Sequence, residues 1–272
     1  MVFKDRGIEI KTPEQIEKMR AAGLVVGQTL ELLRASVRPG MTTLELDQIA
    51  EDNIRSSGAS PSFKGYHGFT GSICASVNDE VVHGIPGERV IKDGDVISID
   101  CGAIVDGWHG DAAITVAVGD VPEDALELMR VTEEAMWRGF AAARLGGRVT
   151  DISHAVESYV RSQGDYGIIE EYVGHGIGSA MHQPPNVPNY GRPGRGPKLV
   201  EGLALAVEPM VVSGHQATHV LADDWTVKTD DGSLAAHFEH SFTLTPKGAW
   251  ILTALDGGEA KLAELGVPFG GR

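Results

Sequence analysis

The stretch SIDCGAIVDGWHGDAAITV, residues 98–116, predicts a β-hairpin. Asp106-Gly107 stands between two β-branched runs, and this dipeptide is typical of a two-residue hairpin turn. With these residues at the turn, Asp100 and Asp111 lie on one face as diagonal neighbours, about 7–8 Å apart at Cα. A single Asp alone would favour an edge hairpin with a solvated acid. Since two unpaired buried carboxylates are costly, the otherwise apolar ribbon favours a cation site.

Three further residues stand in strand contexts that suit a metal ligand. His175 lies between two glycines, directly after a β-branched run, and neutral imidazole is a common metal ligand. Glu208 ends the apolar stretch ALAVEPM just before a proline, and Glu239 lies within AHFEHSFTLT, residues 236–245. Each of these residues alone also fits an ordinary core, edge or strand-end position. Taken together with the hairpin acids, they predict one shared site.

The charges of this set favour two cations. Four ionised carboxylates sum to −4, which two divalent ions balance. Oxygen ligands with one imidazole suit Co, Mn, Fe, Zn or Ni, among which the sequence does not distinguish. Two such ions about 3.5–4 Å apart can polarise a carbonyl group. The set therefore predicts a hydrolase with two divalent metal ions.

The rest of the chain predicts one α+β domain in two similar halves. Four amphipathic helices are expected, at 13–38, 43–57, 122–145 and 150–163. Strands are expected at 73–77, 96–118, 168–173, 203–212 and 236–245, with a Gly- and Pro-rich loop at 174–198. The result is a helix–helix–strand unit, present twice around a mostly antiparallel sheet.

A weak internal similarity supports this duplication. With a shift of 110 residues, Glu17, Met19 and Arg20 match Glu127, Met129 and Arg130; with a shift of 106, Glu51, Arg55, Ser56 and Gly58 match Glu157, Arg161, Ser162 and Gly164. Chance similarity between amphipathic helices is the alternative.

Composition limits the class of protein. The 272 residues have a net charge of −15, which argues against direct nucleic-acid binding. One small basic segment lies at 191–198. The two cysteines form no CxxC pair, and no signal peptide or apolar run of about 18 residues is present. A cytoplasmic enzyme with no membrane contact is expected.

The motifs together resemble the methionine aminopeptidases of the pita-bread (creatinase/aminopeptidase) fold. The resemblance covers about residues 12–255 and rests on VNDEVVHGIP, IDCGAIVDGWHGDAA, GHGIG, VEPM, DDWTVKTDDGS and EHSFTLT. It implies a single catalytic domain over 1–272, with an N-terminal arm at 1–11 and a C-terminal tail at 256–272. Without the type II insertion or the eukaryotic zinc-binding extension, the chain is similar to the bacterial type I form.

The resemblance implies a role for each ligand. Asp100 would bind one metal, His175 and Glu208 the other, and Asp111 and Glu239 would bridge the two. Glu208 would also assist deprotonation of the attacking water.

The resemblance also implies the residues that meet the substrate. His182 would stabilise the tetrahedral intermediate, and His83 would contact the substrate amide nitrogen. A methionine pocket would be lined by Phe63, Tyr66, Phe69, Cys74, Met181 and Trp225. Phe63 and Met181 replace a cysteine and an aromatic residue familiar in the family, which bears on the shape of the pocket.

The implied activity is removal of N-terminal methionine from peptides and nascent chains, with preference for a small second residue. A monomer is expected, and association with the ribosome is left open. Two alternatives stand beside this reading. A proline-specific peptidase of the same fold usually has a large N-terminal domain, for which residues 1–11 leave no room. A non-catalytic peptide-binding module would tend to lose metal ligands, and all five are present.

Overall fold

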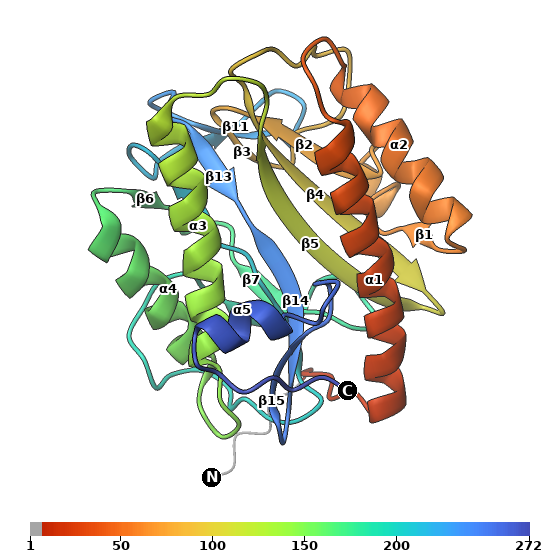
Figure 1. The fold of residues 1–272 in the computed structure, drawn as a ribbon, viewed down its shortest axis with the longest axis vertical. Helices are drawn as coiled ribbons and strands as arrows, with labels where there is room; N and C mark the ends of the chain where they lie inside the picture. The colour runs from red at the N-terminus through yellow and green to blue at the C-terminus, as the bar shows by residue number, and fades with distance from the viewer. Residues whose placement is uncertain (1–6) are drawn as a thin grey trace.

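A computed structural model describes residues 7–272 of the chain (Figure 1). The first six residues of the predicted N-terminal arm lie outside the described residues. Two pairs of helices flank a curled central sheet, and their long helices lie across one of its faces (Figure 1). Among residues 7–272, no helix is long and apolar enough to cross a membrane.

The predicted hairpin is confirmed. β4 (Val96–Val105) and β5 (Trp108–Ala117) pair antiparallel across a turn at Asp106-Gly107. Both turn residues have positive φ, 50° and 80°, as a type I′ turn requires. In this register Gly102 faces Asp111 and Asp100 faces Ala113, so the two carboxylates share one face of the ribbon.

The four predicted helices are confirmed with small shifts at their ends. They are α1 (Pro13–Ser36), α2 (Thr43–Ser56), α3 (Glu123–Ala142) and α4 (Val149–Gln163). Thr12 caps α1 as predicted, and Thr42 caps α2; each forms a reciprocal capping box with the third helical residue. Helix α1 packs on the β4–β5 hairpin and covers the outer face of the first half.

The main sheet is antiparallel, as predicted. Its strands run in the order β1-β4-β5-β14-β9-β7-β8, with β2 added on β4 and β15 added on β14. Besides the hairpin strands, these are β1 (Ser60–Pro61), β2 (Ile73–Val77), β7 (Gly174–Gly176), β8 (Gln183–Val187), β9 (Ala204–Val207), β14 (Glu239–Thr245) and β15 (Gly248–Ile251).

Two small sheets and two short helices complete the fold. One sheet holds β6 (Gly167–Ile168), β10 (Met210–Val212) and β13 (Ala235–His237); the other holds β3 (Glu80–Val82), β11 (Thr218–Val220) and β12 (Val227–Thr229). The short helices are the 3-10 turn η1 (Tyr66–Gly68) and α5 (Glu259–Glu264).

Two predicted strands are each broken in the middle. The strand expected at 203–212 divides at Glu208-Pro209 into β9 and β10, and the one expected at 236–245 divides at Phe238 into β13 and β14. Proline has no N–H to offer a ladder, and the two parts of each strand enter different sheets. Glu208 and Glu239 therefore lie where the main sheet meets the small β6–β10–β13 sheet.

Two other predictions around His175 were wrong. The strand expected at 168–173 shrinks to the two-residue β6, and the loop expected at 174–198 contains β7 and β8. β7 and β8 could not be predicted as strands, because they are short and rich in Gly and Pro. Neither has the alternating pattern of a longer strand.

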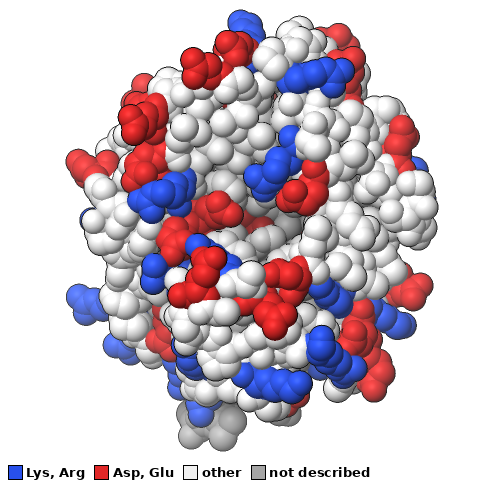
Figure 2. Space-filling view, in the orientation of Figure 1, with Lys and Arg blue, Asp and Glu red and all other residues white. Residues whose placement is uncertain are grey.

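The C-terminal tail packs onto the body of the molecule. Leu262 of α5 is fully buried, and the amide of Gly270 donates to the carbonyl of Ala249 at 2.7 Å. On the helical face in Figure 2, acidic and basic side chains are interspersed around a central hollow. Between α1 and α3, residues from both helices line a cavity of about 300 Å³.

Candidate metal centre

The predicted site residues lie around a single cavity of about 420 Å³. It is lined by every predicted ligand and every predicted substrate contact: Phe63, Tyr66, Phe69, Cys74, His83, Asp100, Asp111, His175, Met181, His182, Glu208, Trp225 and Glu239. Residues that the sequence did not single out also line it: His67, Val82, Glu171, Tyr172 and Val173.

At the floor of this cavity, the buried ligand atoms form two overlapping groups. Asp111, His175 and Glu239 place one ligand atom each within 4.8 Å of one another, and so do Glu208, His237 and Glu239. Glu239 is thus common to both groups. Nε2 of His175 lies 3.3 Å from Oε1 of Glu208.

Asp100 joins the cluster beside Asp111, its diagonal neighbour on the β4–β5 ribbon. Burial raises the pKa of Asp100 to about 7. Burial and the charges of Glu239 and Asp100 hold the pKa of Asp111 well above its usual range.

The same cluster leaves buried ligand atoms without partners. Oδ1 of Asp100, Oδ1 of Asp111 and Oε1 of Glu239 find no hydrogen-bond partner among residues 7–272. Burial first, then neighbouring carboxylates, raises the pKa of both Glu208 and Glu239. Since buried polar atoms are almost always paired, these oxygens fit a divalent cation.

His175 is held in the form that a metal needs. Its Nδ1 lies 2.9 Å from the carbonyl oxygen of Gly176, so Nδ1 must carry the proton and Nε2 a free electron pair. Burial and then His182 lower its pKa to about 3. The flanking glycines are required by close approach: a Cβ on Gly174 would lie 2.3 Å from the carbonyl oxygen of Ala206.

His237 is the residue that the sequence reasoning missed. Its Nε2 is buried without a hydrogen-bond partner among the described residues, 3.9 Å from Oε2 of Glu208 and from Oε2 of Glu239. The available signal was its position two residues before Glu239, on the same face of the predicted strand.

Above the carboxylates, the cavity is apolar. Phe63, Phe69, Cys74 and Met181 are buried and pack together, with Tyr66 and Trp225 against them. The rings of Phe69 and Trp225 meet edge to face at 5.0 Å. Aromatic rings and sulfur around a narrow cavity suit a flexible thioether side chain.

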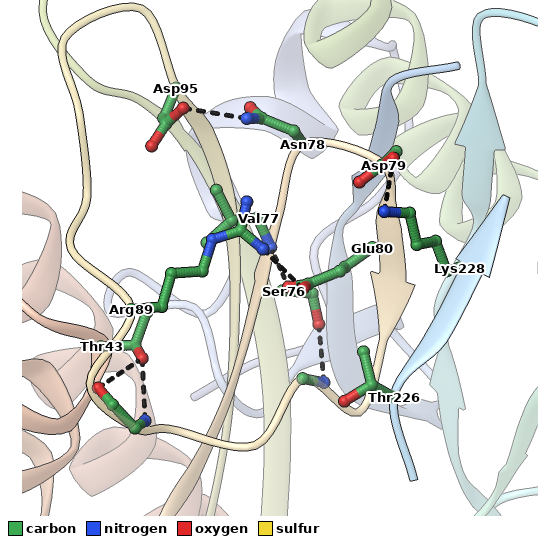
Figure 3. Close-up of polar contacts among 12 residues, drawn as sticks. Thr43, Ser76, Val77, Asn78, Asp79, Glu80, Arg89, Asp95, Thr226 and Lys228 are labelled. Carbon is green, nitrogen blue, oxygen red and sulfur yellow. Dashed lines mark hydrogen bonds and ion pairs between the residues drawn. The ribbon is translucent and has the colours of Figure 1, made fainter. Parts of the chain in front are cut away.

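His83 lines the cavity, and polar contacts hold the chain on either side of it. It follows β3 with a positive φ of 61°, which a non-glycine residue adopts only where its neighbours enforce it. The next amide, of Gly84, donates to Oγ of Ser76 at 3.0 Å. Across the same loop, Glu80 accepts from the amide of Val77 and from Arg89 (Figure 3).

His182 has a hydrogen-bond partner in the pocket wall. The hydroxyl of Tyr66 lies 2.9 Å from its Nδ1. Burial and then His67 lower the pKa of His182, so the ring is neutral at pH 7. In the tautomer in which Tyr66 donates this bond, His182 carries its proton at Nε2.

The fold and this buried carboxylate–imidazole cluster define a metal-dependent peptidase. A family model described as "Metallopeptidase family M24" matches residues 17–246, and the chain belongs to that family. The methionine aminopeptidase of Clostridium acetobutylicum is 54% identical over 247 residues, 90% of this chain and 98% of that one. Within the family, the chain belongs to the methionine aminopeptidases.

Solved structures agree with this assignment and with the predicted pita-bread fold. The methionine aminopeptidase of Thermotoga maritima has a TM-score of 0.89 at 44% identity, over 91% of this chain and 99% of that one. The prolidase of Pyrococcus furiosus has a TM-score of 0.73 at 23% identity, over 90% of this chain and 65% of that one. The second likeness shows the fold alone.

Metal should stabilise the chain, and more strongly at higher pH. Without metal, the clustered acids have raised pKa values, so their contribution to stability is greatest below pH 4 and is lost as the pH rises through the folded pKa, about 7 for Asp100. A divalent ion at about 100 times its dissociation constant adds about 2.7 kcal/mol, which raises the Tm by about 5–10 °C.

Melting curves of chelator-treated and metal-loaded protein at pH 5.5 and pH 8 measure this effect. The gain in Tm should be larger at pH 8, because ligand carboxyls must lose their protons to bind metal. An equal Tm with and without metal at pH 8, after confirmed metal removal, would contradict a clustered site.

Proposed function

We propose that this enzyme removes the N-terminal methionine from peptides and newly made proteins by hydrolysing the first peptide bond with the aid of two divalent metal ions. The observation that supports this most directly is the cavity itself. Aromatic and sulfur side chains line one part of it, and buried carboxylates and His175 line another. A methionine side chain would occupy the apolar part while its peptide bond lies at the polar part.

Five residues would hold the metal ions: Asp100, Asp111, His175, Glu208 and Glu239. Asp111 and Glu239 would be shared between the two ions, because Asp111 lies beside Asp100 on the hairpin and both acids are grouped with His175. When bound, divalent ions supply Lewis acidity, which polarises the scissile carbonyl and acidifies water.

The chain's own groups would then move protons and stabilise charge. Glu208 would accept a proton from the attacking water, since its carboxylate lies at the polar part of the cavity, 3.3 Å from Nε2 of His175. His182, with its proton at Nε2 opposite the Tyr66 hydroxyl, would donate to the oxygen that becomes negative. His83, whose pKa is lowered to about 4 by burial, would contact the substrate amide nitrogen as a neutral ring.

The pocket should prefer methionine over leucine without excluding leucine. Leucine is branched at Cγ and fits a narrow aromatic slot less well, and one group in an apolar pocket is worth about 10–200-fold in kcat/KM. The measurement is kcat/KM for Met-Ala-Ser, Leu-Ala-Ser, Met-Leu-Ser and Ala-Pro-Ser. Met-Leu-Ser should react more slowly than Met-Ala-Ser, because the enzyme is proposed to prefer a small second residue.

Each peptide also tests an alternative. Equal rates on Met-Ala-Ser and Leu-Ala-Ser would mean that the pocket is not a methionine pocket. Preference for Ala-Pro-Ser would indicate a proline-specific peptidase. No cleavage of any peptide by metal-loaded protein would favour a peptide-binding module.

The proposed substrates indicate where the enzyme acts in the cell and which molecules it meets there. Nascent and newly made chains are available in the cytoplasm, so we place the enzyme there as a monomer acting on methionyl N-termini. Contact with the ribosome would bring it to these substrates, and co-sedimentation with ribosomes tests that contact.

A further inference from the structure

The segment before α1 crosses the loop that contains Met181 and His182. Glu9 accepts three hydrogen bonds from this loop: from the amide of Ser179 at 3.0 Å, from its hydroxyl at 2.7 Å, and from Nε2 of Gln183 at 3.0 Å. Ser179 and Gln183 lie at the two ends of the stretch that holds Met181 and His182. The carboxylate of Glu9 therefore joins the two ends of this loop, which we call its base.

Lys11 fixes this contact to the body of the molecule. Its side chain is only 1% exposed, and its Nζ donates to the carbonyl of Glu9 at 3.1 Å and to Oε1 of Gln183 at 3.4 Å. Its backbone amide donates to the carbonyl of Gly202 at 2.8 Å, just before β9. A lysine this deeply buried loses hydration, which only such specific contacts offset.

Gly178 explains how closely the segment passes over the loop. A Cβ at this position would lie 2.2 Å from Oε2 of Glu9 and 2.3 Å from Cε of Lys11. On the other side, the amide of His109, on β5, donates to the carbonyl of Gly178 at 3.0 Å. The loop is thus held between the N-terminal segment and the strand that provides Asp111.

We propose that Glu9 and Lys11 are positioning residues for the methionine pocket and for His182. The inference rests on the proposed function, because it assigns the consequence of the contact to catalysis. Met181 is buried in the pocket and His182 contacts the Tyr66 hydroxyl, while Glu9 joins the two ends of the stretch that holds them. A displacement of about 1 Å in a group that stabilises the transition state can reduce the rate by about 10²-fold.

Hydrogen exchange of the metal-loaded protein tests the positioning directly. Hydrogen bonds to a charged group are worth about 1.5–3 kcal/mol, so Glu9→Ala should speed exchange of the 178–183 amides by about tenfold or more. Glu9→Gln, which keeps an acceptor oxygen, should show a smaller increase. Glu17→Ala is the matched control: it removes a 3.0 Å contact with Arg272 that does not touch the loop, and should leave exchange unchanged.

Kinetics on Met-Ala-Ser and Leu-Ala-Ser test whether the position of this loop affects catalysis and the preference for methionine. Glu9→Ala should lower kcat/KM for Met-Ala-Ser by about tenfold and narrow the preference over Leu-Ala-Ser, since both His182 and Met181 lose their positions. Because part of the effect acts through His182, adding Glu9→Ala to His182→Ala should cost clearly less than the tenfold that Glu9→Ala costs the wild-type enzyme. A merely destabilising change would not alter the peptide preference.

Unchanged exchange at 178–183 in Glu9→Ala would overturn the inference, and so would a double variant tenfold below His182→Ala. Failure of the wild-type enzyme to cleave Met-Ala-Ser would instead reject the proposed function. In that case, the exchange rates still decide whether Glu9 holds the loop.

Discussion

Replacing Glu239 with glutamine should lower kcat/KM by about 10³-fold or more. The amide has the same size as the carboxylate, so the change removes charge from a fully buried position without leaving a cavity. Glu239 is proposed to hold both ions, and its ligand atoms lie among those of Asp111 and His175 on one side and of Glu208 and His237 on the other. Loss of its charge should therefore weaken the binding of both ions, and a single electrostatic contact at a reacting group is worth about 10²–10³-fold.

The measurement is kcat/KM together with metal content after dialysis against a fixed metal concentration. Asp111→Asn should behave like Glu239→Gln, whereas Glu264→Gln, on the exposed side of α5, should match the wild type in both respects. Near-normal turnover with full metal content in Glu239→Gln would reject the proposed bridge.

Replacing His182 with alanine should reduce kcat by about 10²-fold or more while metal content stays unchanged. In the proposed mechanism this ring stabilises negative charge that develops on the substrate, as an oxyanion-hole donor does. It is not among the clustered ligand atoms, although its ring lies 4.4 Å from that of His175. The effect should therefore fall on kcat more than on KM.

Two comparisons separate this role from a structural one. Tyr66→Phe removes the hydroxyl beside Nδ1 of His182 and should produce a smaller loss of the same kind. His154→Ala, on the exposed face of α4, should have no effect. Loss of bound metal in His182→Ala would make His182 a ligand or a support for one, and would contradict the proposed role.

The parts of the fold that could be predicted are those with strong local signals. Asp106-Gly107 fixed the hairpin register, and with it the shared face of Asp100 and Asp111. Thr12 and Pro13 marked the start of α1 correctly. In both cases, the residues that determine the structure lie next to it in the chain.

The parts that could not be predicted depend on distant contacts. β7 is three residues long and exists because β8 and β9 pair with it. The apolar run through Glu208 looks continuous in sequence, yet it changes sheets there. His237 was missed because a lone histidine is usually a core residue, and its nearness to Glu208 depends on that same change of sheets.

The separation of the ligands along the chain determines what activity can report. Asp100 and Asp111 belong to the first half, whereas His175, Glu208 and Glu239 belong to the second. Neither half alone offers the whole set, although the second half by itself brings Glu208, His237 and Glu239 within reach of one another. A chain in which only one half is folded would therefore lack the complete site. Activity would thus report that the two halves have packed together, and not only that each has folded.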